Sequence, residues 1–92
     1  MIAVNEYLDG AVKSLAYENN GKSTVGVINA GEYEFGTSTH ETMTIVEGAM
    51  EVLLPSQSEW RTYLAGQQFE VPAHTSFKVK AAQQVAYLCK YK

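Results

Sequence analysis

One carboxylate in this chain stands where its type and spacing could do chemistry. Glu41 opens the alternating run Glu41-Thr-Met-Thr-Ile-Val46, which predicts a strand with Glu41, Met43 and Ile45 on one face. If that face is buried, the loss of solvation raises the pKa of the carboxyl group unless partners hold it ionised. Glu41 is therefore the candidate catalytic residue, acting by hydrogen bonding to a ligand or by stabilising positive charge. A hydrogen-bonded structural carboxylate is the alternative.

The two histidines are separate candidates. His40 precedes Glu41, so in a strand its side chain points to the opposite face. His74 follows Pro72 and Ala73 in a predicted turn, where it either faces solvent or contacts a ligand. A metal held by His40, Glu41 and His74 is a further alternative, because imidazole and carboxylate groups bind first-row metals. The three residues lack a fixed ligand spacing, which disfavours that alternative.

Strands must position these residues, since turn signals recur about every 8–12 residues along the chain. Asn20-Gly21 is the strongest signal, because both residues accept the positive φ of a type I′ hairpin. No window keeps the i, i+3, i+4, i+7 spacing of an amphipathic helix, so we expect an all-β fold with less than ~10% helix. The predicted strands cover residues 4–8, 11–17, 23–29, 32–37, 41–46, 49–54, 60–64, 67–71, 75–80 and 84–91.

Length and charge limit the possible functions. The chain has 92 residues and a net charge of −3, which predicts a single domain over residues 1–92. The seven Lys and Arg residues are scattered, so we expect no nucleic-acid partner. No apolar run approaches the ~20 residues of a membrane span, so we expect no membrane partner. Cys89 is the only cysteine and cannot form an internal disulfide, which fits a cytoplasmic protein.

Open sheet edges predict self-association. A small barrel leaves strand edges exposed, and pairing with a second copy removes them. The segment 4–8 is short and partly apolar, and Gly10 separates it from the next strand, so it could reach a neighbour. We therefore expect a homodimer rather than a monomer.

Two short segments resemble the two-part signature of the cupin superfamily. Glu41 is followed after six residues by Gly48, and Gly66 is followed after five residues by Pro72. These pairs match the end of the first cupin motif, G-x5-H-x-H-x3-4-E-x6-G, and the start of the second, G-x5-P-x-G-x2-H-x3-N. The resemblance implies a single-domain cupin-like jelly-roll barrel, or double-stranded β-helix, with Glu41 pointing into the barrel.

The metal ligands of that signature are missing from this chain. The two histidine positions of the first motif fall within residues 34–37, which are Glu, Phe, Gly and Thr. In the second motif, Phe77 stands at the histidine position, Ala81 at the asparagine position and His74 at the second glycine position. We therefore expect no bound metal and no cofactor.

A closer resemblance runs along the whole chain. The stretches that carry it are Asn5-Glu-Tyr, Val12-Lys-Ser14, Val25-Gly-Val27, Gly31-Glu-Tyr, Glu41-x-Met-Thr44, Gly48-Ala, Val52-Leu-Leu-Pro55, Phe69-x-Val-Pro72 and Tyr87-Leu-Cys-x-Tyr91. In this order they resemble the small cupin-type pyrimidine/purine nucleoside phosphorylase family of bacteria. The resemblance implies reversible phosphorolysis, in which a nucleoside and inorganic phosphate give a free base and a pentose 1-phosphate, with broad tolerance of bases. A non-catalytic cupin that binds a nucleoside or sugar is the alternative, and a metal-dependent cupin enzyme with substitute ligands is a third.

Phosphorolysis requires a protein to hold phosphate, stabilise a cationic ribose and assist the departing base. Glu41 would bind the ribose hydroxyls or stabilise an oxocarbenium-like centre. Arg61 is the candidate for phosphate, since a guanidinium fork suits that anion, although a surface stacking pair with Trp60 is the alternative. His74 or Arg61 would lie at the mouth of the cavity. The other candidate substrate-binding residues, each with a core or surface role as the alternative, are Met43, Tyr33, Phe77, Tyr87 and Lys90.

Overall fold

The computed structural model describes residues 2–92, and these residues form strands and turns without any helix. The all-β prediction is confirmed, and each predicted strand is present with both ends within one residue of its predicted bounds. Among residues 2–92 there is accordingly no helix that could span a membrane. The strands are β1 (Ala3–Tyr7), β2 (Val12–Glu18), β3 (Lys22–Ile28), β4 (Gly31–Gly36), β5 (Glu41–Glu47), β6 (Ala49–Leu53), β7 (Arg61–Leu64), β8 (Gln68–Val71), β9 (Ser76–Ala81) and β10 (Val85–Tyr91).

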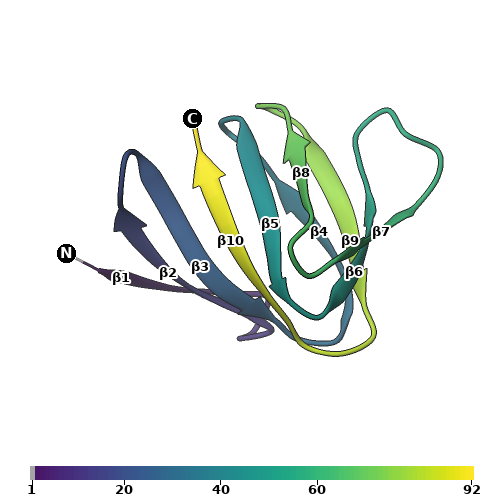
Figure 1. The fold of residues 1–92 in the computed structure, drawn as a ribbon, viewed down its shortest axis with the longest axis horizontal. Coiled ribbons are helices and arrows are strands. Elements are labelled where there is room, and N and C mark those ends of the chain that lie inside the picture. Colours follow the sequence, from purple (N-terminus) through teal and green to yellow (C-terminus); the bar gives the residue numbers. More distant parts are fainter. Residues whose placement is uncertain (1) are drawn as a thin grey trace.

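Two antiparallel sheets face each other (Figure 1). The larger sheet has the strand order β1-β2-β3-β10-β5-β8, and the smaller sheet has the order β4-β9-β6-β7. The C-terminal strand β10 therefore pairs with both β3 and β5 in the middle of the larger sheet. Strands distant in sequence thus become neighbours, as in a jelly roll.

The core lies between the two sheets and follows the alternation of the strands. In β5 the buried side chains are Met43 and Ile45, and in β9 they are Phe77, Val79 and Ala81, while the residues between them face outward. Burying one such side chain contributes about 1.5–3 kcal/mol relative to leaving it in water. Aromatic contacts link the sheets, because the Phe69 ring lies edge-on to the Phe77 ring with 5.9 Å between their centroids.

The hairpin between β2 and β3 turns at Asn20-Gly21, where both residues have the positive φ that the sequence predicts, 50° and 114°. The strand register leaves three residues, 19–21, in the loop, whereas a type I′ hairpin has two. This turn fixes the register of β2 and β3, with Glu18 opposite Lys22 and Ala16 opposite Thr24. It thereby places Lys22 at the first position of β3.

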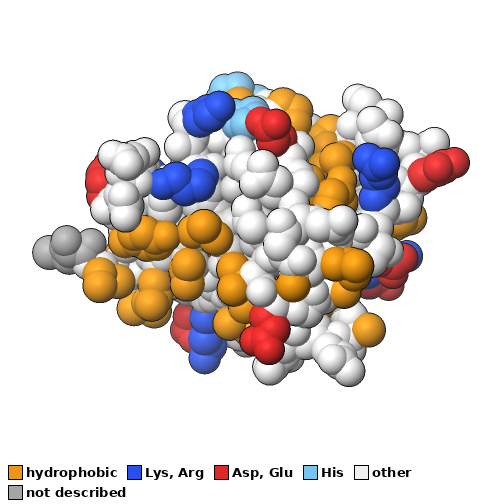
Figure 2. Space-filling model, viewed as in Figure 1, with side chains coloured by type: hydrophobic (Ala, Val, Ile, Leu, Met, Phe, Trp, Pro, Cys, Tyr) orange, Lys and Arg blue, Asp and Glu red, His pale blue; other side chains and the backbone are white. Residues whose placement is uncertain are grey.

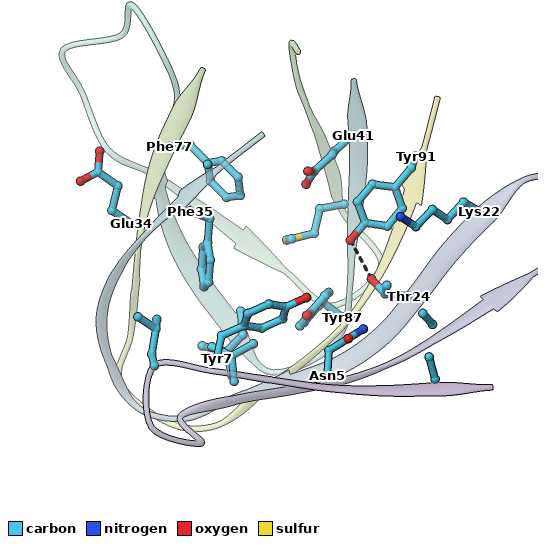
Figure 3. A pocket seen from close by; sticks show the side chains of 17 residues that line it. Asn5, Tyr7, Lys22, Thr24, Glu34, Phe35, Glu41, Phe77, Tyr87 and Tyr91 are labelled. Carbon is cyan, nitrogen blue, oxygen red and sulfur yellow. Dashed lines mark hydrogen bonds between the residues drawn. The ribbon is translucent and has the colours of Figure 1, made fainter. Parts of the chain in front are cut away.

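The N-terminal segment belongs to the chain's own larger sheet. β1 pairs with β2 from Ala3 opposite Ala16 to Tyr7 opposite Val12. Leu8 and Asp9, with φ values of 55° and 57°, make the reversal that returns the chain. The segment that the sequence suggested could reach a neighbour is thus an edge strand, and it turns one face toward the space between the sheets (Figure 3).

Candidate active site

A cavity of about 750 Å³ opens between the N-terminal strands of the larger sheet and strands β4 and β9 of the smaller one (Figure 3). Its volume lies in the usual range for small-molecule sites. Its lining residues are Ala3, Asn5, Tyr7, Leu8, Val12, Ala16, Lys22, Thr24, Ile28, Glu34, Phe35, Gly36, Glu41, Met43, Phe77, Tyr87 and Tyr91.

One side of the cavity is an aromatic wall made of Phe35 on β4 and Phe77 on β9 (Figure 3). The two residues are paired across the strands, and their ring centroids are 5.7 Å apart at a tilt of 42°. Such a surface offers π faces to a flat ligand without hydrogen bonds that would select one ring over another. This wall is suited to an aromatic group of the ligand.

The opposite side is a polar wall made of Lys22, Thr24, Glu41 and Tyr91. The hydroxyl groups of Thr24 and Tyr91 are hydrogen-bonded at 3.1 Å. The Lys22 ammonium group lies 5.4 Å from the centroid of the Tyr91 ring. Burial raises the pKa of Tyr91, so its hydroxyl stays neutral and can both donate and accept. Of the cavity-lining residues that the structure describes, Lys22 is the only lysine or arginine.

Glu41 begins β5 and projects into the cavity beside Tyr91 (Figure 3). Burial raises the pKa of this carboxyl group, and the hydrogen bond from Cys89 and the nearby His40 only partly oppose the effect. The Cys89 thiol donates to Glu41 Oε1 at 3.5 Å. Burial also raises the pKa of Cys89 to about 12, so the thiol keeps its proton and remains a donor. The sequence prediction of an inward carboxylate in a desolvated position matches this geometry.

Tyr87 on β10 lines the cavity from the middle of the larger sheet. It stands opposite Gly26 of β3, and a Cβ atom on Gly26 would lie 2.7 Å from the Tyr87 hydroxyl oxygen. Only glycine therefore leaves room for this ring. Burial raises the pKa of Tyr87 to about 12, with a hydrogen bond to Ser14 acting in the opposite direction, so the phenol stays protonated.

Four of the predicted site residues line this cavity, and the structure brings them together. They are Glu41 and Met43 on β5, Phe77 on β9 and Tyr87 on β10. These residues come from separate parts of the chain. Strands β10 and β5 are neighbours in the larger sheet, with Cys89 opposite Met43, and β9 belongs to the smaller sheet across the core.

The other four predicted residues do not line the cavity. Arg61 is exposed at the start of β7, and the ring of Trp60 is covered by the Lys80 ammonium at 4.1 Å rather than by a neighbouring guanidinium. His74 is exposed in a turn with a φ of 59°, as its place at a glycine position predicted. The remaining two are Tyr33, which donates to Ala30 O at 2.9 Å, and Lys90, which donates to Asn19 O at 2.7 Å.

Strand alternation explains why Lys90 is outside and why other cavity residues were missed. In β10 the buried residues are Val85, Tyr87 and Cys89, so Lys90 projects from the outer face. In β3 the even-numbered residues face inward, and Lys22 therefore shares a face with Thr24. Lys22 follows the hairpin tip and is exposed, so its side chain lies at the solvent edge of the cavity. The same counting from a core residue such as Ile28 would have found it.

Asn5, Phe35 and Tyr91 are among the cavity residues that the sequence did not single out, and Tyr7, one of several tyrosines that could stack on a base, also lines the cavity. Asn5 and Tyr7 alternate on β1 and point into the cavity (Figure 3). Their contribution depends on β1 folding back along β2, which local sequence does not reveal.

The residues at the cupin metal positions do not fit a metal centre. Phe35 and Phe77 present only hydrocarbon to the cavity. Of the other residues at 34–37, Glu34 accepts a hydrogen bond from the Ser76 hydroxyl at 3.0 Å, and the Thr37 hydroxyl donates to Pro72 O at 2.7 Å. His40 lies with its Nε2 atom 3.0 Å from Glu70 Oε1, and among residues 2–92 no three His, Cys, Asp or Glu side chains gather into a metal-binding group. A cluster of His40, Glu41 and His74, considered as an alternative from the sequence, is therefore not formed.

Comparison with known sequences decides the family. The family model for pyrimidine/purine nucleoside phosphorylase matches residues 2–91. The chain belongs to this family. A pyrimidine/purine nucleoside phosphorylase of Marinobacter nauticus is 55% identical over 92 residues, covering 99% of each chain. One of Pseudomonas fluorescens is 54% identical over 93 residues, covering 100% of this chain and 99% of the relative.

Solved structures agree with this nucleoside phosphorylase family assignment at the level of the fold. A protein of unknown function from Vibrio parahaemolyticus is 40% identical, with a TM-score of 0.96 and coverage of 100% of this chain and 99% of that one. An RmlC-like cupin from Shewanella frigidimarina is 17% identical, with a TM-score of 0.78 and coverage of 99% and 83%. The predicted cupin-like fold is confirmed.

Proposed function

We propose that this protein is a broad-specificity nucleoside phosphorylase that works in the cavity between the aromatic and polar walls. A phosphate oxygen forms a bond to C1′ of the ribose while the bond from C1′ to the base nitrogen breaks. The base leaves with the electron pair of that bond and takes up a proton, so the reaction is a pentosyl transfer. The single observation that carries the proposal is the desolvated carboxylate of Glu41 facing a 750 Å³ cavity in a member of this family.

The aromatic wall accounts for tolerance of different bases. Phe35 and Phe77 would stack on a purine or a pyrimidine ring, and neither side chain has a hydrogen-bonding group that would select one base. Stacking on an aromatic side chain is typically insensitive to base identity. Met43, beside them in the cavity lining, provides an adaptable apolar contact.

Lys22 is the proposed phosphate ligand. It is the cation available among the described cavity-lining residues, and the hydroxyl groups of Thr24 and Tyr91 lie on the same wall. An ammonium group and neutral hydroxyl donors together suit an anionic oxygen. This assignment takes the role that the sequence suggested for Arg61, since Arg61 lies outside the cavity lining.

Glu41 is the proposed catalytic residue. An ionised carboxylate in a partly desolvated site interacts strongly with positive charge that develops on the ribose, and it can accept hydrogen bonds from the ribose hydroxyls. The Cys89 thiol holds one carboxylate oxygen, at 3.5 Å, and thus orients the group. Because burial raises the pKa of Glu41, the ionised form needed here is lost at a higher pH than for an exposed glutamate.

Inorganic phosphate is a co-substrate in this proposal, and no metal or organic cofactor has a role. A cytoplasmic location and a homodimer are also part of it. The buried free thiol of Cys89 supports a reducing compartment. A non-catalytic nucleoside-binding cupin is not favoured, because the relatives that match the whole chain are named as enzymes.

The test is phosphate-dependent release of a free base. Purified protein is incubated with uridine or inosine, with and without inorganic phosphate, and the free base is followed by ultraviolet absorbance. We expect release from both nucleosides only when phosphate, or arsenate in its place, is present. Binding of nucleosides without any release under these conditions would contradict the proposal and support the binding cupin.

A further inference from the structure

The departing base is the part of the proposed reaction that develops negative charge. As the bond from C1′ to the base breaks, its electron pair spreads over the ring onto a carbonyl oxygen of a pyrimidine or a second ring nitrogen of a purine. A hydrogen-bond donor at the edge of the base stabilises this charge in the transition state. The donor has to be a cavity group that is not already engaged elsewhere in the protein.

Most polar side chains of the cavity lining already have a hydrogen-bonding partner. The pairs are Thr24 with Tyr91, Glu41 with Cys89, Glu34 with Ser76 and Tyr87 with Ser14. Of the polar lining residues that the structure describes, Asn5, Tyr7 and Lys22 stand outside these pairs. Because Lys22 is the proposed phosphate ligand, Asn5 and Tyr7 are left for the base.

Tyr7 extends into the cavity from its open side. It is the last residue of β1 and 49% exposed, and in Figure 3 its ring lies between Phe35 of the aromatic wall and Tyr87. Burial raises the pKa of Tyr87, and the phenol of Tyr7 is near enough to add to the effect. Asn5 is drawn further along β1, below Thr24 of the polar wall. A base stacked on the aromatic wall therefore has the Tyr7 hydroxyl as its nearer donor.

The turn that follows Tyr7 holds the residue in this place. Leu8 and Asp9 have left-handed φ values of 55° and 57°, a conformation that is uncommon for leucine. Gly10 N donates to Tyr7 O at 3.1 Å, and Tyr7 is paired with Val12 of β2. Non-glycine residues in this conformation are often found in segments that bind a ligand. Leu8 itself lines the cavity, so the turn forms part of its rim.

We propose that Tyr7 is a second catalytic residue, which donates a hydrogen bond to the departing base; this inference rests on the proposed function. Phosphate forms its bond to C1′, the C1′–N bond breaks and the base keeps the electron pair. Tyr7 retains its proton; the base takes a proton from water, and the hydrogen phosphate that becomes pentose 1-phosphate returns one. Because a phenol hydroxyl rotates about its C–O bond, it can meet acceptors at different positions on purines and pyrimidines.

The test compares Tyr7→Phe with Tyr17→Phe. Both variants lose one hydroxyl group and keep the ring, but Tyr17 lies on β2 and is not among the cavity-lining residues. The substrates are uridine and 5-nitrouridine, whose base leaves more readily because the nitro group withdraws electrons. We expect kcat/KM of Tyr7→Phe to fall about 100-fold with uridine, as for loss of one donor to a developing charge, and much less with 5-nitrouridine. Tyr17→Phe should match the wild type with both.

The dependence on the leaving group separates this role from a structural one. An equal loss of kcat/KM with both substrates, or no loss at all, would show that the Tyr7 hydroxyl does not assist the base. Asn5→Leu is measured beside it, and a loss confined to uridine in that variant alone would assign the donor to Asn5 instead. In these cases the proposed function stands, because the wild type still releases base. A wild type without phosphate-dependent release would overturn both the proposed function and the role of Tyr7.

Discussion

Strands β6 and β9 of the smaller sheet differ from strands β2 and β3 of the larger sheet in which side chains, polar or apolar, face inward (Figure 2 shows one face of the molecule). In β6 and β9 the inward residues, such as Val52 and Val79, are apolar, and the outward residues, such as Glu51 and Lys78, are charged. In β2 and β3 the order is partly reversed, because Ser14, Thr24 and Gly26 face inward beside the apolar Val12 and Ile28, while Leu15, Val25 and Val27 face outward.

This difference in polarity distinguishes the strands that mainly stabilise the core from the strands that line the cavity. The inward side chains of β6 and β9 stabilise the fold by burying hydrocarbon, whereas β2 and β3 place polar groups beside the cavity and leave several apolar side chains exposed. We call the part formed by β2 and β3 the reversed end. The proposed active site lies at this end of the molecule.

The largest expected effect is on catalysis at the reversed end. Glu41→Gln keeps the shape of the side chain but removes its charge, and loss of one such interaction with a transition state typically lowers the rate by ~10²–10³. Glu51→Gln, on the outer face of β6, is the matched control and should leave kcat unchanged. Steady-state kinetics of uridine phosphorolysis measures both. A folded Glu41→Gln variant with nearly full activity would show that Glu41 is structural.

The next effect concerns the cation of the polar wall. Lys22→Met removes one charged contact to phosphate, and the apparent KM for phosphate should rise about 10–100-fold, with a much smaller change in the KM for nucleoside. Lys78→Met removes a lysine from the outward face of β9 and should change neither constant. Equal changes for the two lysine variants would remove Lys22 from the phosphate site.

A stability effect is expected where glycine faces inward at the reversed end. The methyl group in Gly26→Ala would meet the Tyr87 hydroxyl and Lys13 carbonyl oxygens, each at 2.7 Å, so we expect a loss of about 1–3 kcal/mol in the free energy of unfolding. Gly36→Ala is the control, since its new Cβ atom would have its nearest neighbour at 3.9 Å. Urea denaturation compares the two. Similar stability of both variants would mean that the Tyr87 ring can move aside.

The smallest effect is a gain in stability from removing the charge of Glu41. The folded-state pKa of Glu41 is raised by burial, so the carboxyl group stabilises the fold most when protonated, and this contribution is lost as pH rises through the folded-state pKa. Glu41→Gln should therefore melt at a slightly higher temperature than the wild type at neutral pH, with the difference shrinking in acid. Melting curves across that pH range test the sign. A lower melting temperature for the variant at neutral pH would contradict it.

If Glu41 is catalytic as proposed, the same carboxyl group should set the acid side of the activity profile. The ionised form is the active one in our proposal, so activity should fall as pH drops through a pKa above the ordinary value of 4.5. The remaining activity of Glu41→Gln should lack this acid limb. Measuring kcat/KM against pH for the wild type and for Glu41→Gln checks this. If the variant shows the same loss of activity in acid, a group other than Glu41 causes that loss.

Local sequence was sufficient for the strands and for part of the site. Alternation and turn residues such as Asn20 and Gly21 determined the strand bounds, because hairpin geometry depends on adjacent residues. The inward position of Glu41, and Phe77 at a cupin ligand position, came from the resemblance to the cupin signature, and both residues line the cavity. Asn5 was missed because its place depends on how β1 folds back along β2 over the cavity, whereas Lys22 could have been found from the alternation of β3.

The most direct test of the central claim is to identify both products in one experiment. Wild-type protein is mixed with uridine and inorganic phosphate, and phosphorus NMR follows the sugar phosphate while absorbance follows uracil. We predict a new ribose 1-phosphate signal that grows in equal amount with uracil, and a rate lower by ~10²–10³ in Glu41→Gln. Uracil without ribose 1-phosphate, or equal rates for the two proteins, would contradict the account.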